Sequence, residues 1–226
     1  MNRLKQLFIT LPFLTTMALN STAQKQRSFL ALGDSYTIGE AVSAAESFPY
    51  QLKEALLKQG HTVESLKIIA QTGWTTDELQ TAIAAETLSP PYDLVTLLIG
   101  VNNQYRGYSV ANYRVEFEQL LRQAIAFAGD DAARVRVLSI PDWGVTPFAT
   151  QKGVDPIQVA NGIAAYNQAK KEICEKQGIQ FIDITDDYRI NGGSTEGVVE
   201  DQLHPSKLIY EQWTGKLLSE LKKMNF

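Results

Sequence analysis

Length, composition and charge already restrict what this chain can be. It has 226 residues, of which 44% are hydrophobic and 20% charged, and its formal net charge is −4. These values are typical of a globular protein with a substantial core and unlike those of disordered or collagen-like chains. Because the chain is weakly acidic, nucleic acid and anionic membrane surfaces are not expected as partners.

The first 23 residues have the pattern of a secretory signal peptide. The stretch "MNRLKQ" carries positive charge, the apolar run "LFITLPFLTTMAL" follows, and "STA" supplies small residues for cleavage. The run is shorter than the roughly 20 residues that cross a bilayer, so no stable membrane span is predicted. A buried amphipathic helix is the alternative. The signal-peptide interpretation predicts a secreted or periplasmic protein whose mature chain begins near Gln24.

Apolar runs then alternate with stretches of helical period. In chain order, the predicted elements are a strand at 28–32, a helix at 46–60, a strand at 64–70, a helix at 75–86, a strand at 93–100, a helix at 110–129, a strand at 134–140, a helix at 156–178, a strand at 179–184 and a helix at 205–224. In the first helix, Leu52, Leu56 and Leu57 are expected on one face, and Thr76 or Asp77 is expected to cap the second.

This alternation indicates βαβ units around a parallel sheet that is covered on both faces. The strand at 93–100 is apolar on both faces, as a central parallel strand should be. Because the sequence has no repeat, low-complexity tract or linker, residues 24–226 are expected to form a single domain. In such sheets ligands bind outside the carboxyl ends of the strands, so functional motifs should follow strands.

Four polar stretches meet this expectation. "GDSYTIG" (33–39), "QTGWTT" (71–76) and "GVNNQYRG" (100–107) follow the first three strands, and "DQLHPS" (201–206) precedes the last helix. Acyl transfer to serine needs an exposed hydroxyl, a histidine base, a carboxylate that orients the ring, and donors for the oxyanion. Ser35, His204 and Asp201 supply the first three. The predicted donors are the backbone N–H groups of Ser35 and Gly73 and the side-chain amide of Asn102.

These blocks resemble those of the SGNH family, the GDSL-type esterases and lipases. Ser35 in "GDSY", Gly73 in "QTGWT", Asn102 in "GVNN" and His204 in "DQLHP" match in the same order, from Gly33 to Pro205. The resemblance implies a flavodoxin-like three-layer α/β/α sandwich with a five-stranded parallel sheet. It also implies ester hydrolysis through an acyl-enzyme without a metal or an organic cofactor.

The sequence departs from the family pattern in two places. Tyr36 follows the serine where many relatives have leucine, and Asn103 stands where an aspartate is frequent, which puts the rigidity of that loop in question. The G-x-S-x-G elbow of the α/β-hydrolases is absent because Thr37 is the second residue after Ser35.

Each assignment has a structural alternative. Ser35 alone would be read as a helix cap, and His204 as a helix-start residue beside Pro205. Spacing to His204 favours Asp201 as the orienting acid over its competitors Glu200, Asp186 and Asp187. Asp34 is expected to be structural.

Other reactive residue types are few. Cys174 is the single cysteine, so an intrachain disulfide is excluded, and its helical position predicts a core residue. His61 lies in a polar turn, where no catalytic role is expected. Two histidines and one cysteine are too few for a nitrogen- and sulfur-rich zinc site.

The segments 139–155 and 102–109 are expected to wall the substrate pocket because both leave the carboxyl edge of the sheet. The candidate pocket residues are Trp74, Tyr105, Trp143 and Phe148. Arg106 is expected to be a solvated loop charge.

The sequence thus predicts a serine esterase for short- to medium-chain acyl esters or lysophospholipid-like lipids. A carbohydrate O-acetyl esterase is the alternative enzyme, and a non-catalytic binding module on the same fold is the alternative of another class. Such a module should have lost a triad member, and this chain retains all three. The expected partner is a small-molecule ester, and no protein partner is evident from the sequence.

Overall fold

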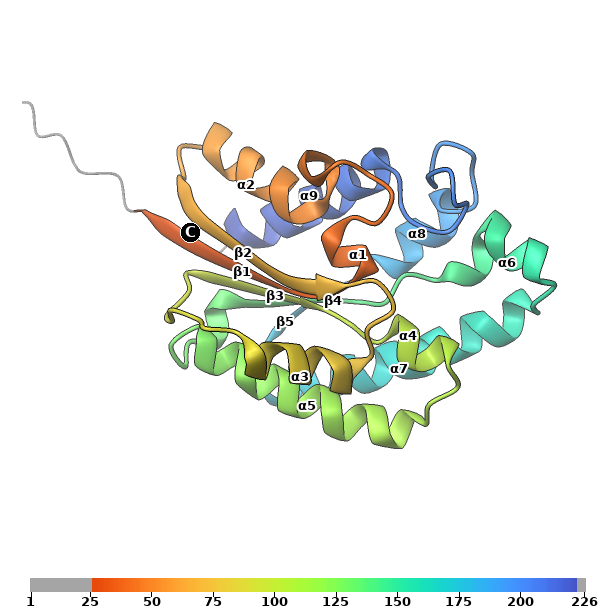
Figure 1. Ribbon diagram of the computed structural model, residues 1–226, viewed down its shortest axis with the longest axis horizontal. Coiled ribbons are helices and arrows are strands. Elements are labelled where there is room, and N and C mark those ends of the chain that lie inside the picture. The colour runs from red at the N-terminus through yellow and green to blue at the C-terminus, as the bar shows by residue number, and fades with distance from the viewer. Residues whose placement is uncertain (1–25, 223–226) are drawn as a thin grey trace, which may run out of the picture.

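The computed structural model describes residues 26–222 (Figure 1). The predicted signal peptide at 1–23 lies outside these residues and stays a prediction. Within the described chain, no helix combines the length and the apolar character that crossing a membrane requires.

Five parallel strands form one sheet in the order β2-β1-β3-β4-β5. The chain starts in the middle at β1, moves outward to β2, and then crosses to β3 on the other side of β1. This order is that of the flavodoxin-like folds, in which the ligand site lies at the switch point between β1 and β3. The strand bounds are β1 (Arg27–Asp34), β2 (Val63–Gln71), β3 (Leu94–Leu98), β4 (Val135–Leu138) and β5 (Gln180–Ile182).

Helices cover both faces of the sheet, as Figure 1 shows, and complete a three-layer α/β/α sandwich. One face carries α2 (Phe48–Lys58) and α9 (Lys207–Lys222), and the other carries α3 (Thr76–Ala85), α5 (Val110–Phe127) and α7 (Pro156–Lys176). The predicted fold class is confirmed. Short helices follow several strands or connect to them: α1 (Ser35–Ile38), α4 (Val101–Tyr105), α6 (Pro147–Lys152) and α8 (Thr185–Asn191), with 3₁₀ turns at Ala44–Glu46, Ala132–Arg134 and Trp143–Val145.

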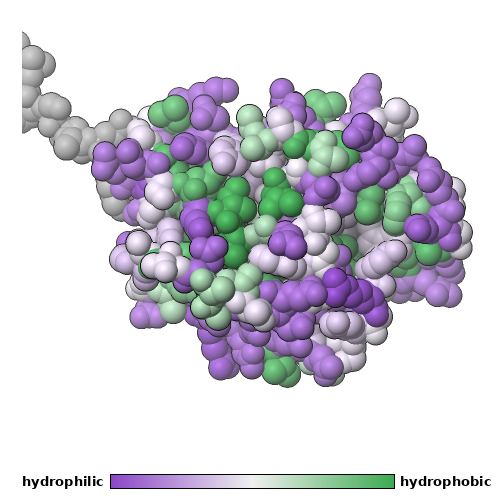
Figure 2. Space-filling view, viewed as in Figure 1, coloured by the Kyte–Doolittle hydropathy of each residue, from purple (hydrophilic) through white to green (hydrophobic). Residues whose placement is uncertain are grey.

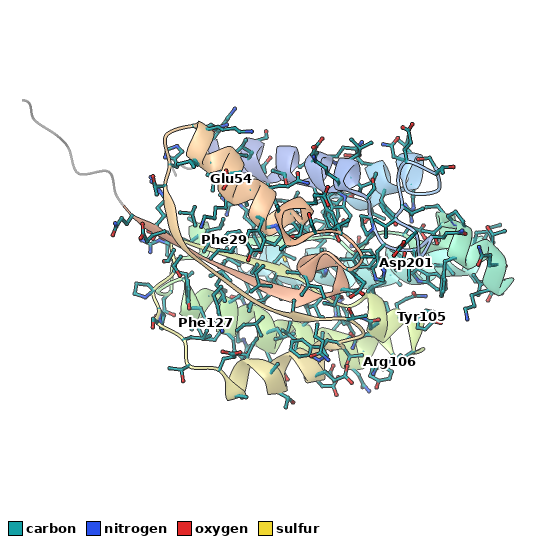
Figure 3. All side chains as sticks on the ribbon, turned by 45° about the horizontal axis from the view of Figure 1, so that its top comes forward. Phe29, Glu54, Tyr105, Arg106, Phe127 and Asp201 are labelled. Atoms are coloured by element: carbon teal, nitrogen blue, oxygen red, sulfur yellow. The ribbon has the colours of Figure 1, made fainter. Side chains whose placement is uncertain are left out.

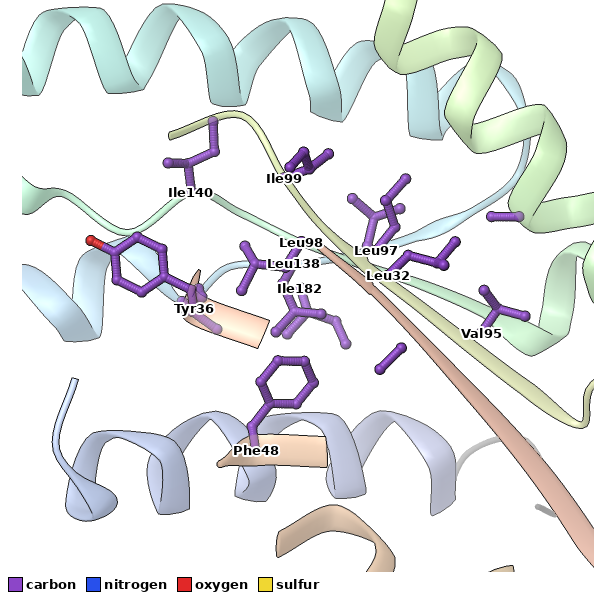
Figure 4. Packing of buried hydrophobic residues seen from close by; sticks show 14 of the residues in the cluster. Leu32, Tyr36, Phe48, Val95, Leu97, Leu98, Ile99, Leu138, Ile140 and Ile182 are labelled. Carbon is purple, nitrogen blue, oxygen red and sulfur yellow. The ribbon is translucent and has the colours of Figure 1, made fainter. Parts of the chain in front are cut away.

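Side chains alternate between the two faces of the strands. In Figure 4, Leu98 lies toward Phe48 of α2, whereas Ile99 and Ile140 lie on the opposite side. All four side chains are buried in one continuous hydrophobic cluster. The two helical layers are therefore held to the sheet by separate sets of apolar residues.

The β2 edge of the sheet is at the front in Figure 1, and Figure 2 shows apolar side chains on this face interspersed with polar ones. Leu66 and Ile68 of β2 are partly buried against the core. Between them, the Lys67 ammonium pairs with the Glu86 carboxylate at 2.8 Å. A charged lysine on an edge strand discourages pairing with another sheet.

Three local expectations need correction. Leu57 is 50% exposed, because a residue adjacent to the buried Leu56 is turned about 100° away from it around the helix. The cap of α3 is Thr75, whose backbone N–H donates to Glu78 at 2.8 Å in a capping box. The last helix begins at Lys207 and not at Pro205, because Pro205 forms a β-bridge with Val198.

A buried lysine stands out in the core. Lys170 of α7 is fully buried, donates to the carbonyl oxygen of Leu138 at 2.9 Å, and lies 5.5 Å from the centre of the Phe117 ring. Burial lowers the pKa of Lys170 from 10.5 to about 7, and its electrostatic partners there are Cys174 and Asp34. Burial likewise raises the pKa of Asp34 from 3.8 to about 7.

We predict that this lysine makes stability depend on pH above neutrality. Between its native pKa of about 7 and its unfolded value of 10.5, the unfolded chain binds a proton that the native chain does not. The free energy of unfolding should therefore rise with pH in that window, by up to ~1.4 kcal/mol per pH unit from this one group. Urea unfolding of wild type and Lys170→Met across the window measures it. Parallel curves for the two proteins would contradict the prediction.

Candidate active site

A cavity of about 170 Å³ opens at the carboxyl edge of the sheet. Its walls come from α1, from α4, from the segment after β4 and from the segment before α9. Figure 3 places Asp201, Tyr105 and Arg106 at this end of the molecule, away from Phe127. The lining residues are Ser35, Tyr36, Val101, Asn102, Tyr105, Trp143, Phe148, Leu203 and His204.

Ser35 is the first residue of α1, directly after β1. The Asp34 carboxylate accepts the Tyr36 N–H at 3.1 Å and caps the turn, while Gly39, in the left-handed region at φ 79°, ends it with an N–H to the Ser35 carbonyl. Ser35 is therefore held at the cavity by a turn that its neighbours cap at both ends. The capping hydrogen bond that Asp34 accepts agrees with the structural role predicted for this residue.

Gly33 leaves no room for a side chain. A Cβ atom there would lie 2.1 Å from the Thr37 hydroxyl oxygen and 2.4 Å from the Leu98 carbonyl oxygen. The absence of a side chain lets the turn that bears Ser35 pack directly against the end of β3. Residues of α1 and of α4, which follows β3, line the same cavity.

His204 and Asp201 form a hydrogen-bonded pair. The His204 Nδ1 atom is 2.5 Å from Asp201 Oδ2, and Asp201 Oδ1 accepts the backbone N–H groups of Leu203 and His204, both at 2.9 Å. Burial works to raise the pKa of Asp201, but these hydrogen bonds outweigh it and hold the pKa below its usual value. With Nδ1–H donating to the carboxylate, Nε2 of the neutral ring is the acceptor.

The competing acids are engaged elsewhere. Asp186 pairs with Arg189 at 3.2 Å, and Asp187 pairs with Lys216 at 2.7 Å. Glu200 is exposed. Among the acids considered from the sequence, Asp201 is thus the one that binds the His204 ring.

Asn102 of α4 lines the same cavity as Ser35 and His204. Its side-chain amide donates one N–H to the Trp74 carbonyl oxygen at 3.0 Å, which leaves the second N–H of that amide for another acceptor. Gly73 and Trp74 themselves lie outside the set of lining residues, and Trp74 packs partly buried against the core. The donor role of Gly73 stays a prediction.

Three aromatic side chains form one wall. The Trp143 and Tyr105 rings meet edge to face with centres 5.2 Å apart, and Phe148 lies 6.4 Å from Trp143. The Trp143 indole N–H donates to Gln104 Oε1 at 2.8 Å. Gln104 is in turn packed against Gly162 of α7, where a Cβ would come within 2.8 Å of its Nε2 atom. Gln104 therefore holds the Trp143 ring of this wall in place, although no sequence pattern singled this residue out.

The family model of the GDSL-like lipases and acylhydrolases matches residues 31–212. The chain belongs to this family. No curated protein sequence matches it at a significant level.

Solved structures agree in fold. The lipase/acylhydrolase from Enterococcus faecalis superposes with a TM-score of 0.69 at 21% identity, over 88% of this chain and 97% of that one. The esterase EstA from Pseudoalteromonas sp. gives 0.68 at 16% identity, over 88% and 98%. Axe2, an acetylxylan esterase from Geobacillus stearothermophilus, gives 0.66 at 15% identity, over 86% and 93%. At these identities the likeness establishes the fold alone.

The two departures from the family pattern have clear structural partners. Tyr36 packs its ring 5.5 Å from that of His204 and 6.2 Å from that of Trp213, so it supports the histidine. Asn103 is fully buried; its Oδ1 accepts the Thr76 N–H at 3.1 Å and its Nδ2 donates to the Thr76 hydroxyl at 2.7 Å. An ionised aspartate could not donate this second bond, and the Thr76 hydroxyl already donates its own proton to Glu116. The neutral side chain therefore ties α4 to the start of α3 and answers the question of loop rigidity.

The other residues considered from the sequence lie in different environments. Arg106, expected to be a solvated charge, donates to the Gly73 carbonyl oxygen at 2.6 Å and pairs with Glu78 at 3.2 Å. Cys174 is buried, and burial raises the pKa of its thiol to about 12. His61 lies outside the cavity lining. Across residues 26–222, no cluster of three or more His, Cys, Asp or Glu side chains could hold a metal ion.

We predict that the close approach at Gly33 makes the protein sensitive to any side chain at this position. Gly33→Ala should lower the free energy of unfolding by ~1–3 kcal/mol, because the new methyl group meets the backbone carbonyl of Leu98. Gly215→Ala in α9 is the matched control. Its Cβ meets nothing within 4 Å, so the higher helix propensity of alanine should stabilise the protein by ~0.5–1 kcal/mol. Urea unfolding measures both. Equal effects of the two substitutions would contradict the steric argument.

Proposed function

We propose that this protein is a serine esterase that hydrolyses carboxylic esters with short acyl chains through an acyl-enzyme. The observation that carries the proposal is the placement of Ser35, Asn102 and the Asp201-bound His204 around one cavity. A non-catalytic binding module would have no need for an ionised acid bound to a histidine beside a capped serine. The same chemistry is expected from the family to which the chain belongs.

The reaction follows from the atoms in place. His204 Nε2 takes the proton of the Ser35 hydroxyl as Oγ attacks the ester carbonyl, and Asp201 stabilises the imidazolium that forms. The oxyanion would accept hydrogen bonds from the Ser35 N–H, the Gly73 N–H and the Asn102 amide. As the intermediate collapses, His204 gives the proton to the leaving alcohol. Water then attacks the acyl-enzyme by the same route and releases the acid.

The size and lining of the cavity support a short acyl group. At about 170 Å³ it is smaller than the ~300–1,000 Å³ of typical small-molecule sites. Val101, Trp143 and Leu203 give its walls an apolar character. A long acyl chain, such as that of a lysophospholipid, would have to continue outside the cavity, so short acyl esters fit better.

A carbohydrate O-acetyl ester is the second candidate substrate. An acetyl group fits the small cavity, and the Tyr105 side chain, 53% exposed, offers an aromatic surface at which a sugar ring could pack as the leaving group. Axe2, which shares the fold, is an acetylxylan esterase. With the predicted signal peptide, either substrate would be met outside the cytoplasm.

The first prediction of this proposal concerns the nucleophile. Wild type should hydrolyse p-nitrophenyl acetate and butyrate with higher kcat/KM than the octanoate and palmitate esters, because the cavity is small. Ser35→Ala should lose nearly all of this turnover while its thermal unfolding stays close to that of wild type. Equal rates for the two proteins would show that Ser35 is not the nucleophile.

Acetylated xylo-oligosaccharides separate the two candidate substrates in the same assay. If these sugars are deacetylated with a higher kcat/KM than p-nitrophenyl acetate, the carbohydrate ester is the better assignment. If p-nitrophenyl butyrate is preferred to both, the simple acyl ester is.

The second prediction concerns the length of the acyl chain. Trp143→Ala should enlarge the cavity and raise the ratio of kcat/KM for octanoate to that for acetate by about tenfold or more, since each accommodated methylene is worth ~1–3 kcal/mol of discrimination. Tyr50→Ala is the control, because Tyr50 is a partly exposed aromatic residue of α2 outside the cavity. An equal loss of rate on all chain lengths would place Trp143 away from the acyl chain.

A further inference from the structure

In the loop after β2, the carbonyl groups of two consecutive residues accept hydrogen bonds from side chains of α4 and of its C-cap residue. The Asn102 amide donates to the carbonyl oxygen of Trp74 at 3.0 Å, and the Arg106 guanidinium donates to that of Gly73 at 2.6 Å. Gly73 has φ +87°, in the left-handed region that glycine adopts without strain. A glycine there is also free to leave that conformation, so the constraint on its backbone must come from its partners.

Arg106 is itself fixed by the start of α3. Its Nη1 atom pairs with Glu78 Oε1 at 3.2 Å, while the other Glu78 oxygen accepts the Thr75 N–H at 2.8 Å. One guanidinium thus connects three structures: the C-cap of α4, the Gly73 carbonyl and the capping box of α3. The planar fork of arginine suits this task because it donates in two fixed directions at once.

The exposure of this pair limits what it contributes to stability. The Arg106 side chain is 39% exposed and that of Glu78 is 40% exposed. Exposed ion pairs contribute little to folding, because water screens them and two long side chains must be ordered. The consequence of the contact must therefore be sought in the geometry of the loop.

We propose that Arg106 is a positioning residue for the oxyanion-binding loop. By holding the Gly73 carbonyl oxygen, it restrains the backbone at Gly73, whose N–H is one of the oxyanion donors of the proposed function. This inference rests on the proposed function, in which the Gly73 N–H is a donor. It gives Arg106 a role through Gly73, without contact to the substrate.

Loss of such a positioning residue should weaken the stabilisation of the transition state and leave the binding of substrate in the ground state unchanged. Donors to the oxyanion act on charge that develops only during the reaction, so kcat should fall while KM stays constant. Loss of a donor itself costs ~10²–10³ in turnover. A donor that is still present but poorly held should cost less, and we expect about a tenfold loss of kcat in Arg106→Ala.

The experiment compares wild type with Arg106→Ala, Arg106→Lys and Arg122→Ala. Arg122 pairs with Glu118 on the exposed side of α5 at 2.6 Å, so Arg122→Ala removes a similar ion pair away from the loop. The readouts are kcat and KM for p-nitrophenyl acetate, per active site titrated with a phosphonate ester. The inhibition constant of a methyl trifluoromethyl ketone, which forms a tetrahedral adduct with a serine, completes the set.

For Arg106→Ala we expect kcat to fall and the ketone inhibition constant to rise by the same factor, with KM changed less than about twofold. Arg106→Lys should recover part of the loss, because an ammonium can donate to the Gly73 carbonyl but cannot hold Glu78 in the same geometry. Arg122→Ala should match wild type. Titration of active sites removes any contribution from misfolded protein.

Three results would overturn the inference. A higher KM with unchanged kcat would mean that Arg106 binds the substrate. Unchanged values in Arg106→Ala, with activity that still depends on Ser35, would reject the positioning role but keep the esterase. Wild-type activity that does not depend on Ser35 would reject the proposed function and this inference with it.

Discussion

The turn that carries Ser35 packs so closely against the end of β3 that only glycine is accommodated at position 33. The Leu98 carbonyl and the Thr37 hydroxyl occupy the space that any Cβ atom would need. Because the order of the sheet places β3 next to β1, the helices that follow these strands, α4 and α1, line one cavity. The relation between Ser35 and Asn102, one on each of these helices, depends on that approach. A wider gap here would separate the Ser35 hydroxyl from the Asn102 amide in the cavity that both residues line.

Around this contact, several groups of the site are held in place by hydrogen bonds to a second residue. Asp34 caps the serine turn, Asp201 binds the His204 ring, and Asn103 ties α4 to the start of α3. Gln104 does the same for the Trp143 ring and Arg106 for the Gly73 carbonyl. Groups held in this way need little rearrangement when charge develops, and electrostatic stabilisation is largest under that condition. Asp34, which precedes the serine, is buried, and burial raises the pKa of its carboxyl group to about 7.

The features that could be predicted from the sequence are those that a short local pattern of residues determines. Apolar runs marked every strand, helical periods marked the long helices, and three of the four polar blocks fell directly after parallel strands. Leu57 and the Thr75 cap lay beyond this reasoning, because neighbouring positions in each helix satisfy the same pattern and only packing decides between them. Arg106 and Gln104 were beyond it for another reason. Their partners, Gly73 and Trp143, are more than thirty residues away in the chain, so no spacing rule connects them.

The residues proposed for the chemistry and those proposed to select the substrate come from different segments of the chain. The proposed nucleophile sits on a capped turn directly after β1, and the proposed base lies next to the β-bridge between Val198 and Pro205. The aromatic wall comes from the segment after β4 and from the end of α4, where ring contacts and the hydrogen bond from Trp143 to Gln104 contribute to its geometry. Substitutions at Trp143 or Phe148 can therefore reshape the cavity while the Asp201–His204 pair keeps its geometry. A fold arranged in this way allows the acyl and alcohol specificities to diverge without a new catalytic apparatus, because the residues that would select the substrate lie on other segments than Ser35, Asp201 and His204.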